Sequence, residues 1–336
     1  MPALLTHLLG TRYPIVSAPM GAVAGGRLAA AVSGAGALGM IGTGYQNAAW
    51  IDREFRAAAG ARVGIGFITW DLAQTPERLA SALAWRPAAV MLSFGDATPF
   101  IDAIRRAGAR LLLQVQSLEA ARQAAALAPD AIVAQGTEAG GHGGGRSLLP
   151  LLPAVVDAVG PIPVLAAGGI ADGRGIAGCL ALGASGVLIG SRFYAAEESL
   201  AAPAGRERMV RGSGDATLRT RVFDVVRRLP WPAEFTGRVL RNQFTDRWHL
   251  DEQGLSHDVD REQSRYAAAV ERGDFDTAAC WAGEGIDLIR EVAPAGELVR
   301  RLVAETGAAL ARLRHEDGAG PSWLRAAEDT SATPAS

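Results

Sequence analysis

The chain has 336 residues, of which 49% are hydrophobic, and a formal net charge of −2 at pH 7. A chain of this length and apolar content can bury the core of a large domain. Neither the net charge nor any basic run favours nucleic acid or an anionic membrane surface, so we expect neither partner. No stretch is long and apolar enough to predict a transmembrane helix.

Two features of the composition exclude classes of chemistry. All 33 basic residues are arginine, which rules out Schiff-base aldolases, pyridoxal-phosphate enzymes and Walker-type phosphate loops, because each needs a lysine. The two cysteines, Cys179 and Cys280, have no metal-binding spacing, so no metal site is predicted. So few thiols, together with an N-terminus that lacks a signal-peptide pattern, predict a cytoplasmic protein.

Short β-rich runs alternate with runs of helical period from residue 13 to about 195, which predicts repeated βα units and a parallel sheet. Eight such runs favour a closed (β/α)8 TIM barrel over an open doubly wound sheet. The predicted strands are Tyr13–Ala18, Ala37–Ile41, Val63–Ile68, Ala89–Phe94, Arg110–Val115, Ala131–Gln135, Ile162–Ala166 and Gly186–Ile189. The predicted helices between them include Pro76–Trp85, Pro99–Ala107, Leu118–Leu127 and Gly173–Leu182.

The alternating pattern breaks after Tyr194, and the region up to about residue 275 is polar and irregular, with Trp231 between two prolines. We interpret it as a smaller lid domain inserted over one end of the barrel. A later amphipathic stretch, Ala295–Leu313, predicts the final barrel helix. The expected organisation is a cofactor-binding barrel over 1–198, a lid over 199–275, helices that complete the barrel over 276–316 and a flexible tail over 317–336.

A glycine-rich loop, Gln135–Gly145, follows the predicted sixth strand and contains His142. Barrels of this class keep their chemistry in loops at the carboxyl ends of the strands, and glycines let the backbone approach a flat or anionic ligand closely. We interpret His142 as the catalytic candidate, the alternative being a loop histidine hydrogen-bonded for structure. Glu138 could be a second acid or base, although a solvated loop carboxylate or a hydrogen-bond anchor for the loop is the favoured interpretation.

Two further glycine loops follow the seventh and eighth predicted strands, at Gly168-Gly169 and at Gly190-Ser191-Arg192. Backbone amides, a hydroxyl and a cation at this place predict a phosphate site, the alternative being that the glycines only form tight turns. Met20 follows a proline at the end of the first strand, so it is either a ligand contact or ordinary core filler.

Four strings of the sequence resemble, in order and spacing, the nitronate monooxygenase family, formerly called 2-nitropropane dioxygenases. They are Ser17–Met20, Gln135–His142, Ala166–Gly173 and Gly190–Phe193. The resemblance covers residues 13 to about 195 and resumes weakly at Phe223-Asp224, Trp231-Pro232, Arg241-Asn242 and Trp281–Gly285. The same flavin superfamily contains FMN-dependent enoyl-ACP reductases and NADH:quinone reductases.

The resemblance implies FMN as the cofactor and matches His142 to the family's catalytic histidine. Met20 would lie beside the flavin ring, Gln114 and Gln135 would hydrogen-bond it, and Gly140 would pack close to it. The implied phosphate site consists of Gly168, Gly169, Leu188, Ile189, Gly190 and Ser191. Gly66 stands where the family often has an asparagine that touches the flavin, so that contact is lost, made by backbone or taken by water.

The activity implied by the resemblance is FMN-dependent oxidation of alkyl nitronates, and of nitroalkanes where His142 acts as the base, by O2 to a carbonyl compound and nitrite. Trp70, Phe94 and Trp231 would form an apolar lid over the site. The alternatives are an FMN-dependent NAD(P)H reductase of a quinone or enoyl thioester, and a non-redox barrel that binds a phosphate ligand. A homodimer is left open as the assembly.

Overall fold

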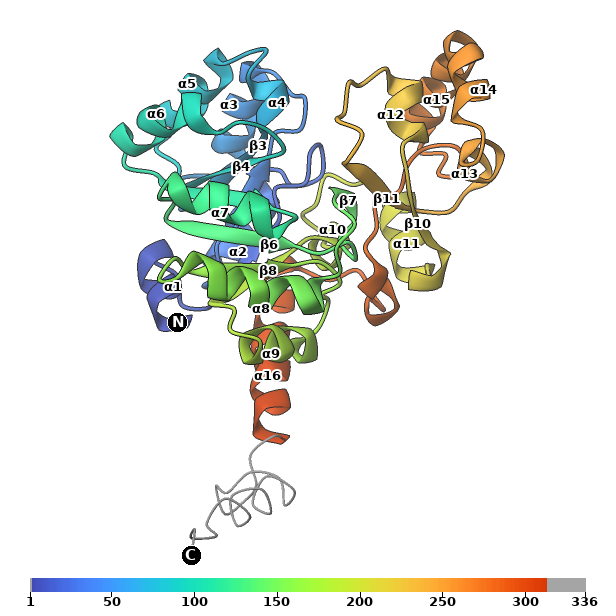
Figure 1. The fold of residues 1–336 in the computed structure, drawn as a ribbon. Coiled ribbons are helices and arrows are strands. Elements are labelled where there is room, and N and C mark those ends of the chain that lie inside the picture. Colours follow the sequence, from blue (N-terminus) through green and yellow to red (C-terminus); the bar gives the residue numbers. More distant parts are fainter. Residues whose placement is uncertain (1, 313–336) are drawn as a thin grey trace, which may run out of the picture.

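The computed structural model describes residues 2–312, in which eight parallel strands form one barrel (Figure 1). The strand order is β1-β9-β8-β6-β5-β4-β3-β2, and a parallel bridge between Val16 and Leu38 joins the two ends. The predicted TIM barrel is therefore confirmed. Its strands are β1 (Ile15–Ser17), β2 (Met40–Gly42), β3 (Gly64–Ile68), β4 (Ala89–Ser93), β5 (Arg110–Val115), β6 (Ala131–Gln135), β8 (Val164–Ala167) and β9 (Gly186–Ile189).

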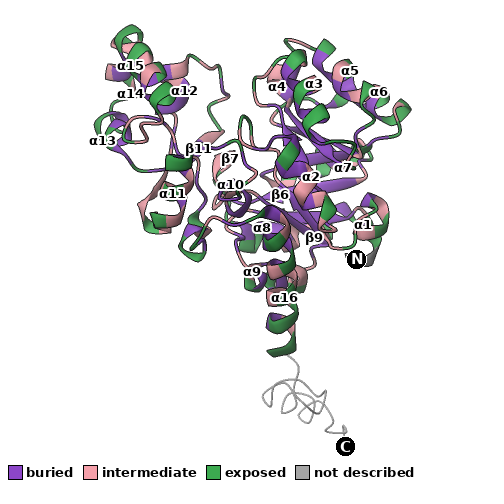
Figure 2. Cartoon of the chain, turned by 180° about the vertical axis from the view of Figure 1, so that it is seen from behind, coloured by how far each residue is buried: buried purple, intermediate pink, exposed green. Residues whose placement is uncertain are grey.

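Alternate residues of each barrel strand face two different cores, as the twofold repeat of a strand requires. In β5, Leu112 belongs to the cluster inside the barrel, whereas Leu111 and Leu113 pack toward the surrounding helices. Helix α1 (Pro2–Leu9) closes the amino-terminal end of the barrel, because its Leu5 and Leu9 are fully buried in the inner cluster. Figure 2 shows the buried strands enclosed by helices whose outer faces are exposed. The carboxyl ends of the strands are thus left as the open end.

The helices around the barrel include all four that were predicted between the strands, with slightly shorter bounds. Helix α16 packs against α9 and α2, as the final helix of a barrel does. It matches the predicted Ala295–Leu313, except that Leu313 and the predicted tail over 317–336 lie outside the described residues. The helices are α2 (Gly26–Gly34), α3 (Ala48–Ala57), α4 (Thr69–Leu72), α5 (Glu77–Ala84), η1 (Thr98–Phe100), α6 (Ile101–Arg106), α7 (Leu118–Ala126), α8 (Leu148–Val159), α9 (Gly173–Ala181), α10 (Ser191–Tyr194) and α16 (Ala295–Arg312).

The region between α10 and α16 is regular rather than irregular, which corrects the expectation for it. Most of its helices have only six to nine residues, fewer than three turns, so their hydrophobic period is hard to recognise in the sequence. They enclose a separate aromatic core around Phe223 and Phe244. The elements are α11 (Pro203–Arg211), η2 (Gly214–Ala216), β10 (Thr217–Thr220), α12 (Val222–Arg227), β11 (Thr236–Leu240), α13 (Gln243–Trp248), α14 (Glu252–His257), α15 (Val259–Arg272) and η3 (Glu284–Leu288).

A short strand from the glycine loop ties this region to the barrel. Strand β7 (Gly141–Gly143) pairs antiparallel with β11, with His142 opposite Gly237, to form the sheet β10-β11-β7. The loop was expected to be without regular structure, and glycines do lower strand propensity. Here β7 forms because the unpaired edge of β11 is available to hydrogen-bond with it. None of the helices in residues 2–312 combines the length and apolar character needed to cross a membrane.

Candidate active site

Two glutamines at the carboxyl ends of β5 and β6 face the barrel axis. Gln114 and Gln135 each come two residues after a residue of the inner cluster, Leu112 and Val133 respectively, so they point to the same side. The Gln114 amide donates to Oε1 of Gln135 at 3.1 Å, and the Gln135 amide donates to the carbonyl of His142 at 3.0 Å. The two predicted flavin contacts therefore lie together, and Gln135 also holds the main chain of the catalytic candidate.

Met20 and Gly190 also lie together, because a Cβ atom on Gly190 would be 3.8 Å from the sulfur of Met20. Gly66 lies under the neighbouring proline: a Cβ atom there would be 2.3 Å from Cγ of Pro19. The Pro19 ring thus occupies the space that the Cβ atom of an asparagine at position 66 would need. A flavin contact at this position would have to come from the backbone or from water.

The two predicted phosphate loops present free amide groups. Gly168 and Gly169 have φ values of +117° and +68°, which only glycine adopts without strain. The N–H groups of Gly168, Gly169 and Gly190 donate to no acceptor within residues 2–312. Such unpaired donors beside a backbone without side chains fit a phosphate group. The side chains of Leu188 and Ile189 are buried in the two barrel cores, so these residues could reach a phosphate only through their backbone.

The segment Trp281–Gly285 covers these loops. The Gly283 amide donates to Oγ of Ser191 at 3.0 Å. A Cβ atom on Gly140 would lie 2.7 Å from the Gly283 nitrogen, and one on Gly285 would lie 2.3 Å from the carbonyl oxygen of Gly169. Glycine is therefore required at positions 140 and 285 by this close backbone packing, whether or not a ligand also contacts them.

Glu138 anchors the loop that carries His142. Its Oε1 and Oε2 accept the amide hydrogen of Leu148, the first residue of α8, at 2.9 and 3.0 Å. Its backbone carbonyl accepts a hydrogen bond from Glu284 at 2.9 Å. The anchoring interpretation of Glu138 is confirmed, because both carboxylate oxygens are engaged by the main chain of the same domain.

His142 is paired with a buried carboxylate from helix α12. Both oxygens of Asp224 lie within hydrogen-bond distance of Nε2, at 3.0 and 2.9 Å, and the two side chains are only 10% and 3% exposed. An ionised carboxylate can only accept, so Nε2 carries a hydrogen and Nδ1 carries the free lone pair. Within residues 2–312, Nδ1 has no hydrogen-bond partner. The pair therefore presents Nδ1 as the basic atom.

Burial is the main cause of a lowered pKa at His142. Burial lowers the pKa of His142 below its ordinary 6.5, and the positive charges of Arg227 and Arg219 lower it further, whereas Asp224 opposes them. Arg227 reaches Asp224 directly, with its guanidinium 3.0 Å from Oδ1. At pH 7 the side chain of His142 is thus uncharged and able to take up a proton.

An aromatic cluster encloses the imidazole ring. Trp231 stacks on His142 with ring centroids 3.5 Å apart and planes at 3°. Trp70 and Phe94 meet the indole edge-on, at 5.4 and 5.1 Å. The indole N–H donates to the hydroxyl of Tyr45 at 2.7 Å, and burial raises the pKa of that hydroxyl to about 12. The three residues expected in an apolar lid are therefore neighbours, and Trp231 is the one of them that contacts His142.

Three residues of this site were not identified from the sequence, namely Tyr45, Asp224 and Arg227. Asp224 lies 82 residues from His142, and no local spacing connects the two. One signal in the sequence could have identified Asp224, because the family resemblance resumes weakly at Phe223-Asp224. A carboxylate on a helix as apolar as VFDVVR is a second signal, because such a group is rarely buried without a partner.

Comparison with known proteins gives a consistent result. The family model described as nitronate monooxygenase matches residues 3–63 and 57–305. A nitronate monooxygenase of Metarhizium robertsii is 36% identical over 89% of this chain and 92% of that protein. The structure of FabK from Thermotoga maritima superposes with a TM-score of 0.82 at 29% identity, over 92% of this chain and 97% of that one. A nitroalkane oxidase of Streptomyces ansochromogenes gives 0.80 at 32% identity, over 92% and 99%.

Proposed function

Since this chain belongs to the nitronate monooxygenase family, whose members are flavin-dependent oxidoreductases, we propose that it uses FMN and O2 to convert small alkyl nitronates to a carbonyl compound and nitrite. The observation that carries the proposal is the orientation of His142, which a buried carboxylate holds at the open end of the barrel with Nδ1 free. A small molecule is the expected substrate, and a homodimer and a cytoplasmic location remain predictions.

The flavin would be held at the open end of the barrel. The free amides of Gly168, Gly169 and Gly190 and the backbone of Leu188, Ile189 and Ser191 would bind its phosphate. Met20, Gln114, Gln135 and Gly140 would lie along its ring, and Gly66 would contribute only backbone. When bound, the flavin supplies the electron-transfer chemistry, and the protein supplies binding, orientation and proton handling.

His142 would handle the proton. With a neutral nitroalkane, Nδ1 would accept the proton from the carbon next to the nitro group, and the resulting imidazolium would remain hydrogen-bonded to Asp224 through Nε2. The same imidazolium would donate a charge-assisted hydrogen bond to the bound nitronate. Trp70, Phe94 and Trp231 would keep water away from this exchange and limit the size of the substrate.

A flavin-dependent NAD(P)H reductase is the second candidate, because the fold superposes equally well on FabK and on the nitroalkane oxidase. Anaerobic spectra of the purified protein separate the candidates. Loss of flavin absorbance on mixing with ethylnitronate, but not with NADPH, is the expected result. Bleaching by NADPH alone would favour the reductase. A colourless protein that cannot be reconstituted with FMN would favour a barrel without redox chemistry.

A further inference from the structure

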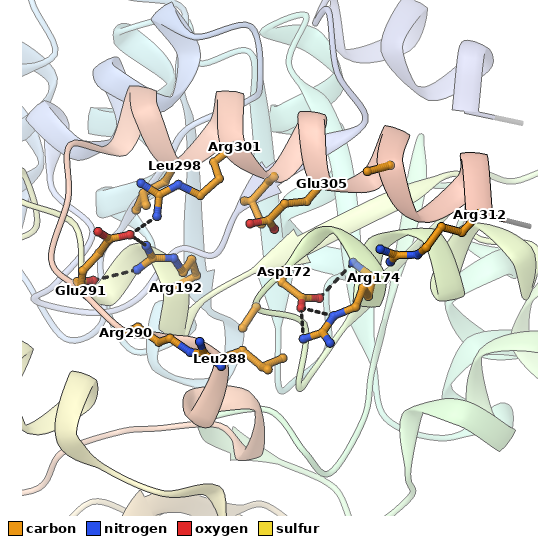
Figure 3. A pocket seen from close by; sticks show the side chains of 13 residues that line it. Asp172, Arg174, Arg192, Leu288, Arg290, Glu291, Leu298, Arg301, Glu305 and Arg312 are labelled. Carbon is orange, nitrogen blue, oxygen red and sulfur yellow. Dashed lines mark hydrogen bonds and ion pairs between the residues drawn. The ribbon is translucent and has the colours of Figure 1, made fainter.

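A cavity of about 430 Å³ lies outside the candidate active site, between α9, α16 and the chain that follows η3 (Figure 3). Its wall is unusual in charge: arginines contribute most of the polar side chains, namely Arg174, Arg192, Arg290, Arg301 and Arg312. The carboxylates are Asp172, Glu291 and Glu305. Leu288, at the end of η3, is 37% exposed and adds an apolar surface, whereas Leu298 and Leu302 of α16 are buried behind the wall.

The arginines of the cavity lie in two groups. In Figure 3, Arg174 and Arg312 lie toward one end with Asp172, and Glu305 lies between the two ends. Arg192 and Arg301 lie beside Glu291 at the other end, and Arg290 lies next to Leu288; these three arginines form the arginine end. Arg301 also pairs with Glu297, which lies outside the cavity wall, at 2.7 Å. Glu305 also raises the pKa of Arg192, so three carboxylates act on these three guanidinium groups. Arg290, however, has no acidic partner within residues 2–312, and the cavity wall as a whole has five arginines and three carboxylates.

Arg192 is the buried member of this arginine end. Its side chain is 6% exposed, it donates to the carbonyl of Glu291 at 3.0 Å, and the nearest carboxylate oxygen is 3.7 Å away on the same residue. That oxygen is shared with Arg301. Burial, and then the nearby charge of Arg301, lower the pKa of Arg192 to about 10. A guanidinium has five N–H donors, so donors remain for a further anionic acceptor.

We propose that the arginine end of this cavity binds the phosphate of a small phosphate monoester whose organic part is uncharged. The three guanidinium groups come from three separate segments, α10, the chain after η3 and α16, so they can meet a tetrahedral phosphate from several directions. The organic part would lie along Leu288, which is exposed in the wall of the cavity. The cavity volume falls within the ordinary range for small-molecule sites.

This site adjoins the candidate flavin loops. Arg192 was expected to supply the cation of the flavin phosphate site, but its side chain lies in the wall of this cavity and donates to the carbonyl of Glu291. Arg192 follows Ser191 directly, and Asp172 comes three residues after Gly169. A ligand here would therefore lie beside residues that directly follow the two phosphate loops in the chain. The proposal stands independently of the activity of the flavin site, so it can be tested by binding alone.

The test uses the protein as purified, after removal of unbound flavin, and measures binding of AMP by titration calorimetry at pH 8, where the phosphate is a dianion. We expect one AMP per chain and no binding of adenosine. Arg290→Met and Arg301→Met should each raise the Kd about tenfold or more, as loss of a charge-assisted hydrogen bond does. Arg211→Met is the matched control, because Arg211 is 82% exposed on α11, outside the cavity.

These two variants are preferred to Arg192→Met because Arg301 and Arg290 are more exposed, and circular dichroism will verify that each variant is folded. The proposal is overturned if AMP fails to bind, if adenosine binds equally well, or if both arginine variants bind AMP with the affinity of the parent. In each of those cases the arginines serve only to tie α16 and the preceding chain to the barrel.

Discussion

Asp224 accepts a hydrogen bond from Nε2 of His142 through both carboxylate oxygens, although the two residues come from different parts of the molecule. His142 belongs to a barrel loop, and Asp224 to a helix of the inserted region. The pair therefore exists only when that region is folded against the barrel. Its effect is to fix the orientation and the tautomer of a neutral imidazole.

Replacing His142 with alanine tests its role as the base. The variant should keep its flavin, because the predicted ring and phosphate contacts lie on other residues. Turnover of a neutral nitroalkane should fall by roughly 10² to 10⁴, the usual contribution of a positioned general base. A nitronate that is ionised before mixing needs no proton removal and should lose much less. Equal rates of the variant and the parent on a neutral nitroalkane would show that His142 is not the base.

The pH profile of kcat/KM for a neutral nitroalkane tests the charges around His142. The basic form is required, and burial places the pKa of His142 below 6.5, so the rate should fall only as the pH drops below that value. Asp224→Asn removes the group that raises this pKa, so the acid limb should move to lower pH. The rate should also fall, by up to roughly 10⁴-fold, because an amide can present a donor and select the wrong tautomer.

Arg227→Met provides the opposing measurement, because the charge of Arg227 lowers the pKa of His142 and neutralises Asp224. Here the acid limb should move to higher pH. If Asp224 and Arg227 had only a structural role, the two variants would change the rate, but the acid limbs of their pH profiles would not move in opposite directions. The proposed electrostatic arrangement would be contradicted if the acid limbs of the two variants moved in the same direction, or if neither moved.

Gly169→Leu tests the phosphate loop. A leucine at φ +68° would be strained, and its Cβ atom would lie 3.2 Å from Cβ of Glu138, inside the cradle of free amides. We expect a folded protein that purifies without flavin, as measured by absorbance and circular dichroism. Gly108→Leu is the matched control: φ there is +74°, but a Cβ atom would meet open space. Stoichiometric flavin in the Gly169 variant would refute the phosphate-site assignment.

Trp231→Ala tests how far the aromatic cluster holds the inserted region in place. Trp231 is 4% exposed and contacts His142, Trp70 and Phe94, so its truncation should lower the free energy of unfolding by about 3–5 kcal/mol. Trp85 is 38% exposed, and Trp85→Ala should lower it by less. Urea denaturation measures both. Similar losses for the two variants would mean that the indole over His142 is not a stabilising contact.

The sequence was sufficient for the barrel because its signals are local. Each strand is a short and nearly continuous apolar run, and glycines mark the loops at the carboxyl ends, so the place of His142 followed from the pattern. Gln114 and Gln135 were expected only because the sequence resembles a known family. The strand ends differ by up to three residues, since pairing with neighbours decides where a strand begins: Ala37–Gly39 were expected in the second strand, which starts at Met40.

The rest of the site depends on contacts between distant segments, which no spacing reveals. Asp224, Arg227 and Tyr45 meet His142 or its partners only after the inserted region has folded. Helix α12 has six residues, too few to show a helical period. Gly140 was expected to pack against flavin, and the structure adds a second reason for its glycine, the close approach of Gly283.

The pairing of β7 with β11 means that the inserted region is not an exchangeable module. A chimera that grafts another lid onto this barrel would have to supply a strand edge for His142 and a carboxylate for its Nε2. Directed evolution toward larger or smaller substrates would also have to preserve this pairing and this carboxylate. Strand β11 pairs with the backbone of His142, so we expect substitutions there to affect the position of the base. Helices α13 to α15 take no part in this pairing and are the safer place to begin.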